Sequence, residues 1–227
     1  MNGVGEIATP LTGLPDLSIV LIPPRGIKKA TRKDAENMER THRMAGWAGV
    51  LGHRWPTALG VAVAALTAFD LELEAGFVAS LKALVAVLAL VYLGSAALDR
   101  RRSAWVVLLA GLPVALFLAP ASGIAAGIVI LAASLAFLAF GAARGRRRGP
   151  GGLSLQAAGM LGFGAIALAT LYVDTVLGAY LVAFALLGHA AWDAFHYLRD
   201  RVVSRSYAEF CAIFDVLLGA AILLALA

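Results

Sequence analysis

Long apolar runs, repeated one after another from about residue 57 to the C-terminus, limit the fold of this chain more than any other feature. Each run is roughly 16 to 24 residues long, which as a helix matches the hydrocarbon core of a bilayer, about 30 Å thick. Hydrophobic residues make up 61% of the chain and charged residues 15%. A water-soluble domain could not bury the apolar surface of so many hydrophobic residues. The runs are continuously apolar, so they predict membrane-spanning helices rather than the alternating strands of a barrel.

The sequence therefore predicts an all-α polytopic membrane bundle of about seven transmembrane helices. The third span is the weakest, because it is short and contains Pro113. We expect the spans near residues 57–75, 76–97, 104–119, 122–143, 153–173, 175–198 and 207–227.

Basic and non-basic breaks alternate strictly between these runs. Under the positive-inside rule, all basic breaks are cytoplasmic only if the chain crosses seven times, with its N-terminus inside and its C-terminus outside. Richness in Ala, Gly, Leu and Arg is typical of GC-rich bacterial genomes, so we expect the bacterial cytoplasmic (inner) membrane. The basic breaks are Arg25 to Arg54, Asp99 to Arg102, Arg144 to Arg148 and Arg199 to Arg205; the others hold Asp70 to Glu74, Pro120 and Asp174.

Residues 1–55 are expected to form a basic cytoplasmic segment that precedes a transmembrane domain at 56–227. Apolar residues at helical spacing between Ala35 and Trp55 predict a helix on the membrane surface, and a partly disordered basic tail is the alternative. Leu17 to Ile22 lacks a basic stretch before it and a cleavage site after it, which argues against a signal peptide. The formal charge of +5 is explained by orientation and by contact with membrane lipids, so nucleic acid is not an expected partner.

Ionisable side chains inside a span are costly, and the densest set lies between residues 188 and 196. At 100° per residue, His189, Asp193 and His196 fall on one face of the helix. The chain then reverses before the last span, so we expect Asp215 at the level of His189 and Glu209 at the level of His196.

These side chains predict a metal site at the cytoplasmic end of the last two spans. Imidazole together with carboxylate favours Zn, Fe or Mn over Mg or Ca. The predicted ligands are His189, Asp193, His196 and Asp215, with Asp215 also a candidate general base and Asp193 a ligand or orienting group. His42 and His53 are further cytoplasmic imidazoles that could complete the site.

Structural roles also account for these residues. A capping box from Ser206 to Glu209 explains Glu209 as a helix-start residue. A buried hydrogen bond that holds two helices together explains His189 and Asp215. A position at the membrane interface, in contact with headgroups or water, explains Asp193 and His196 without a metal.

Three hypotheses of function follow. The first is a metal-dependent membrane enzyme that acts on a lipid or other apolar substrate. The second is a carrier or channel for a proton-coupled small solute, with His189 and Asp215 as a relay. The third is a noncatalytic accessory or scaffold subunit. A homo-oligomer or partner subunit fits the small-xxx-small pair Gly123 and Gly127, which favours close helix packing in lipid.

Several chemistries have no support in the sequence. It contains no Gly-rich phosphate loop, Gly-x-Ser-x-Gly elbow or His-Glu-x-x-His helix. The last span contains no Lys for a retinal Schiff base, and a single cysteine, Cys211, cannot form an internal disulfide. Seven spans with the N-terminus inside are similar to the membrane hydrolases grouped with alkaline ceramidases and progestin/adiponectin receptors. That group carries two histidines four residues apart in a late helix, where this chain has His189 and Asp193.

Two further predictions concern isolated polar residues in the spans. Lys82 is expected to extend outward toward Glu72 or Glu74, as long cationic side chains do in a bilayer. Five aromatic residues near predicted helix ends are expected either to anchor in the headgroup region or to pack in the core: Tyr92, Trp105, Tyr172, Trp192 and Tyr197.

Overall fold

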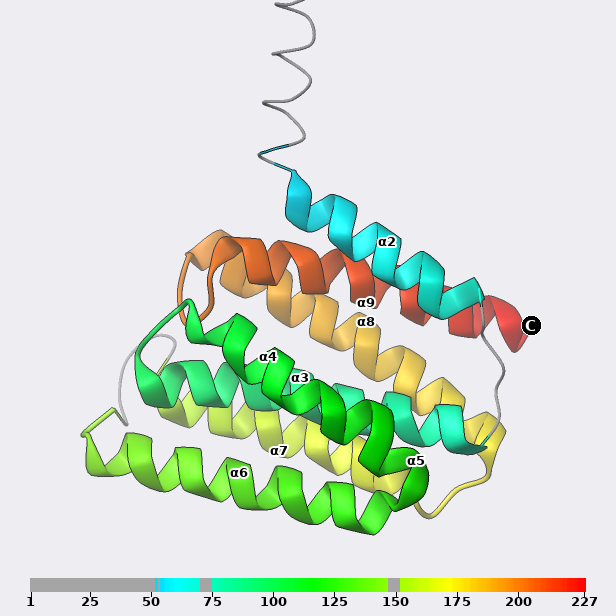
Figure 1. The fold of residues 1–227 in the computed structure, drawn as a ribbon, viewed down its shortest axis with the longest axis horizontal. Coiled ribbons are helices and arrows are strands. Elements are labelled where there is room, and N and C mark those ends of the chain that lie inside the picture. The colour runs from blue at the N-terminus through cyan, green and yellow to red at the C-terminus, as the bar shows by residue number, and fades with distance from the viewer. Residues whose placement is uncertain (1–51, 53, 70–74, 147–151) are drawn as a thin grey trace, which may run out of the picture. The chain divides into compact units, whose positions relative to one another are not determined.

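The computed structural model describes residue 52 and residues 54–69, 75–146 and 152–227. Apart from residues 52, 54 and 55, the predicted surface helix lies outside these residues, as do His42, His53, Glu72 and Glu74. Within the described ranges the regular structure is entirely helical (Figure 1). In order, the elements are α2 (Trp55–Phe69), α3 (Ala75–Leu98), α4 (Ser103–Pro113), a π-helical turn η1 (Val114–Leu118), α5 (Ala119–Ala121), α6 (Gly123–Ala143), α7 (Leu153–Ala169), α8 (Thr175–Arg199) and α9 (Arg205–Ala225).

The described helical segments follow the predicted spans. Pro113 does not end the third span, because a π-helical turn after it carries the helix on through α5. In the part of the chain that the structure describes, five segments are long and apolar enough to cross a membrane: Phe77–Leu98, Ser103–Ala121, Gly123–Ala143, Thr175–Arg199 and Arg205–Ala225. The chain is thus a multi-pass helical membrane bundle.

Two apolar helices are shorter than the bilayer core is thick. α2 has 15 residues and α7 has 17, which correspond to about 22 to 26 Å at 1.5 Å per residue. Seven crossings and the orientation of the bundle therefore stay predictions.

α3 lies at the centre of the bundle and contacts α4, η1, α5, α6, α7 and α8, whereas α9 packs against α8 and α2 (Figure 1). The outside is apolar: Leu66, Phe117, Ile124, Leu161 and Leu224 are each more than 70% exposed. Such a surface suits lipid rather than water as the solvent. Ionisable side chains are instead found in the interior, where membrane proteins place functional groups.

The basic breaks between helices gather at one end of the bundle. Arg101 forms an ion pair of 2.9 Å with Asp200, and the backbone N–H of Ser204 donates to the carbonyl of Arg101 at 3.2 Å. Arg146 pairs with Asp99 at the same end. The breaks at 99–102, 144–146 and 200–204 therefore share one face, as the charge alternation predicts.

The start of α9 differs from the prediction. Ser204, not Ser206, caps the helix, and its Oγ accepts from the backbone N–H of Tyr207 at 3.3 Å. Ser204 has extended backbone angles, which leave its side chain free to reach the first turn, whereas Ser206 is already helical. The predicted capping box at Ser206 is therefore wrong.

Lys82 finds a partner at the other end of the bundle. Its Nζ donates to the carbonyl oxygen of Thr170 at 3.0 Å, just beyond the C-terminus of α7. A cation is favourable there, since the last carbonyls of a helix lack partners and carry partial negative charge.

Candidate metal centre

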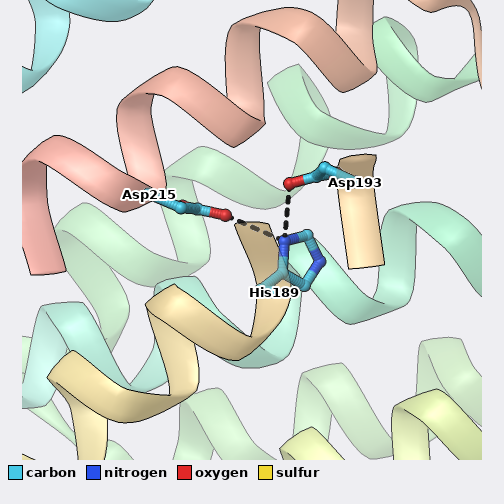
Figure 2. Close-up of side chains that lie close together, drawn as sticks. All are labelled: His189, Asp193 and Asp215. Atoms are coloured by element: carbon cyan, nitrogen blue, oxygen red, sulfur yellow. Dashed lines mark hydrogen bonds and ion pairs between the residues drawn. The ribbon is translucent and has the colours of Figure 1, made fainter. Parts of the chain in front are cut away.

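Three buried side chains from α8 and α9 form the candidate site, which we call the triad: His189, Asp193 and Asp215. Nδ1 of His189 lies 2.9 Å from Oδ2 of Asp215 and 3.1 Å from Oδ2 of Asp193 (Figure 2). The three ligand atoms all lie within 4.8 Å of one another. All three residues have 0% exposure, so the triad is entirely enclosed by protein.

Local sequence explains how the triad assembles. His189 and Asp193 are one helical turn apart, so they project from the same face of α8. The chain reverses between Arg199 and Arg205, which makes α9 antiparallel to α8 and brings Asp215 to the level of His189. The prediction that Asp215 lies at the level of His189 is confirmed by the contact between the two side chains.

Close approach of the two helices depends on Gly219, one turn beyond Asp215. A Cβ atom at Gly219 would lie 3.1 Å from the carbonyl oxygen of Ala183 on α8. The absence of a side chain lets α9 press against the backbone of α8.

The triad lies deeper than the sequence predicts. Asp215 is the middle residue of α9, and His189 is ten residues from the end of α8 at Arg199, which is about 15 Å along the axis. The expected position at the cytoplasmic end of these helices therefore needs correction, because only His196 lies close to that end.

Tyr92 of α3 completes the surroundings of the triad. Its hydroxyl donates to Oδ1 of Asp193 at 2.5 Å, and the residue is only 1% exposed. Of the two places expected for Tyr92, the headgroup region and the core, the structure shows the core. A signal for this contact exists in the sequence: Tyr92 and Asp193 both lie six residues before the ends of helices that run to the basic end, at Leu98 and Arg199.

Aromatic rings cover the triad. Phe163 of α7 meets the ring of His189 edge-on, with 5.1 Å between centroids, and Tyr92 does so from α3 at 5.6 Å. Trp192 is half-buried and packs near both Phe163 and Tyr92. These rings exclude water, which strengthens any electrostatic interaction inside.

His196 stands apart from the triad. A backbone carbonyl can only accept, so Nδ1–H of His196 donates to the carbonyl of Trp192 at 2.9 Å. Its Nε2 then accepts from the amide of Gln156 on α7 at 3.0 Å. Both nitrogens are occupied, and the structure does not bring His196 into the triad.

Glu209, which was expected opposite His196, has other partners. Its carboxylate accepts from the hydroxyl of Thr57 and pairs with Arg54 at 3.4 Å. Both partners lie at the start of α2, which packs against α9. Glu209 therefore ties α2 to α9 and contributes nothing to the triad.

Two atoms of the triad lack hydrogen-bond partners among the described residues: Nε2 of His189 and Oδ1 of Asp215. Buried polar atoms without partners are rare in native proteins and commonly mark the place of a water or an ion. With both carboxylates ionised, the triad carries a net negative charge even when the imidazole is protonated. A divalent cation beside a neutral imidazole would neutralise the two carboxylates.

The spacing of the triad suits a transition metal. Bonds of about 2.0 to 2.1 Å in a tetrahedral arrangement place neighbouring ligand atoms about 3.3 Å apart. The two separations from Nδ1 of His189, 2.9 and 3.1 Å, need only a small expansion to reach that value, and all three ligand atoms lie within 4.8 Å of one another. Three protein ligands with a free fourth position are the pattern of catalytic zinc sites.

Comparisons of the chain with protein-family models, with curated proteins and with solved structures each find no match.

Proposed function

We propose that the chain is a metal-dependent membrane enzyme that acts on a lipid or other apolar substrate, with His189, Asp193 and Asp215 as its metal ligands. One observation carries the proposal: an imidazole and two carboxylates, all fully buried, present ligand atoms within 4.8 Å of one another. Burial of such charges is costly unless they are paired or coordinate a metal. Zn, Fe or Mn fits this set of ligands best.

The two carboxylates have different surroundings, which indicates different roles. Oδ1 of Asp193 is occupied by the Tyr92 hydroxyl, so Asp193 offers only Oδ2 to a metal. Oδ1 of Asp215 has no partner among the described residues, so Asp215 can bind through Oδ2 and accept a proton from a water molecule through Oδ1. A metal bound here would act as a Lewis acid and make that water a better nucleophile.

The surroundings of the triad favour an apolar substrate. No triad residue is exposed, and the rings of Phe163, Tyr92 and Trp192 form its wall. The outer surface of the bundle is apolar as well, so an apolar molecule can approach the bundle from the lipid. A lipid enters such surroundings at little desolvation cost, whereas a charged solute would have a high desolvation cost.

Metal analysis of the purified protein tests the proposal. His189→Gln should abolish binding of one equivalent of Zn²⁺, and His196→Gln should retain it, because His196 is a buried histidine of the same helix whose nitrogens face Gln156 and Trp192. Both variants should elute as the wild type in size-exclusion chromatography. Wild-type protein that takes up no Zn²⁺, Fe²⁺ or Mn²⁺ after dialysis against each ion would refute the proposal and leave transport assays to separate the carrier and accessory-subunit hypotheses.

A further inference from the structure

We propose that Tyr92 is the positioning residue of the metal site: its hydroxyl holds Asp193 so that Oδ2, and not Oδ1, faces His189 and Asp215. This inference rests on the proposed function, because it assigns to Tyr92 a task at the same metal. The contact joins residues 101 positions apart and is a hydrogen bond to the triad from outside the α8–α9 hairpin.

The geometry of Asp193 shows why an outside donor matters. A carboxylate can turn about its Cβ–Cγ bond and exchange its two oxygens. The Tyr92 hydroxyl, 2.5 Å from Oδ1, fixes one oxygen and directs the other toward Nδ1 of His189, 3.1 Å away. A hydrogen bond to a metal-binding carboxylate both orients the ligand and satisfies its second oxygen.

Tyr92 is itself held in place from two sides. Its ring packs 4.7 Å from the ring of His196 and 6.1 Å from that of Tyr207, measured between centroids. His196 in turn is fixed by Gln156 of α7 and by the carbonyl of Trp192. His196 is thus held by partners that lie outside the triad.

Tyr207 of α9 provides a matched control. It is as buried as Tyr92, with 0% exposure against 1%, and its ring packs against Tyr92. Its hydroxyl lies near the Cys211 thiol and has no oxygen or nitrogen partner among the described residues. Tyr207→Phe therefore removes a buried hydroxyl that does not touch the triad.

The experiment compares Tyr92→Phe with Tyr207→Phe in the full chain in detergent, with Co²⁺ as the probe. Loss of a hydrogen bond to a ligand typically weakens metal affinity by about 10- to 100-fold. We expect that loss, and an altered visible Co²⁺ spectrum, for Tyr92→Phe, whereas Tyr207→Phe should keep the wild-type affinity and spectrum. Because Tyr92 acts through Asp193, adding Tyr92→Phe to Asp193→Asn should weaken binding no further.

The outcomes separate the two proposals. Wild type that binds no Co²⁺ or Zn²⁺ overturns the metal site and the role of Tyr92 with it. Wild type that binds Co²⁺ while Tyr92→Phe keeps its affinity and spectrum overturns only the role of Tyr92. Equal weakening in both tyrosine variants, or further weakening of Asp193→Asn by Tyr92→Phe, would also overturn it, since either result indicates packing rather than positioning.

Discussion

The imidazole of His189 contacts two buried carboxylates. We therefore expect removal of His189 alone to destabilise the fold more than removal of the whole triad. The ring nitrogen bonds both Asp193 and Asp215, and none of the three residues has contact with solvent. Deleting one partner of a buried ionic group leaves an uncompensated charge, whereas replacing the entire group with apolar side chains is often neutral or stabilising.

We therefore expect His189→Ala to lower the free energy of unfolding of the metal-free protein by about 3 to 5 kcal/mol. The triple variant His189→Leu, Asp193→Leu, Asp215→Leu should unfold close to the wild type, although it binds no metal. Denaturant titration in mild detergent measures both. A triple variant that is less stable than His189→Ala would show that the triad stabilises the fold.

At the scale of single elements, the α8–α9 hairpin carries the whole triad, so its packing sets the distance between His189 and Asp215. Gly219→Ala would place a methyl group 3.1 Å from the carbonyl oxygen of Ala183 and 3.2 Å from Leu187. Overpacking of this kind typically costs about 1 to 3 kcal/mol. We expect Gly219→Ala to be less stable than the wild type and to bind Co²⁺ more weakly.

Gly127 of α6 is the control for this substitution. A Cβ there meets no atom within 4 Å, and replacing a helical glycine by alanine favours the helix by up to about 1 kcal/mol. Gly127→Ala should therefore bind metal with the affinity of the wild type. Its free energy of unfolding should equal or slightly exceed that of the wild type. If Gly219→Ala behaves in the same way, the close approach of α8 and α9 is not what holds Asp215 in place.

At the scale of the whole molecule, the basic end of the bundle is predicted to face the cytoplasm. The single natural cysteine, Cys211, is buried, and a Cys211→Ser background would leave introduced cysteines as the sites of labelling. Arg102 and Arg144 are exposed at the basic end, and Ala121 and Tyr172 are exposed at the opposite end.

A membrane-impermeant maleimide on intact cells should label Ala121→Cys and Tyr172→Cys. It should label Arg102→Cys and Arg144→Cys only after the membrane is permeabilised, because basic breaks are retained on the cytoplasmic side. The opposite labelling pattern would show that the basic end of the bundle faces outward. Labelling of Ala121→Cys and Tyr172→Cys on different sides would disprove the alternating crossings.

Much of the architecture could be predicted from the sequence because it depends on one-dimensional properties. The length of an apolar run decides whether a helix can cross the bilayer, and a lipid environment permits few other backbone structures. Charge alternation predicted that the basic breaks share one end. The level of Asp215 opposite His189 followed from a short reversal of known length.

Contacts between helices distant in sequence were decided only by the tertiary structure. In water, burial of an apolar stripe indicates which side of a helix faces its neighbours, but in lipid both the inside and the outside are apolar, so that signal is weak. Shape complementarity then selects the neighbours. For this reason the bonds of Gln156 to His196 and of Thr57 to Glu209 did not follow from hydropathy or spacing. For the bond of Tyr92 to Asp193, spacing indicates that the two residues lie at the same level, but only the tertiary structure shows that their helices are neighbours.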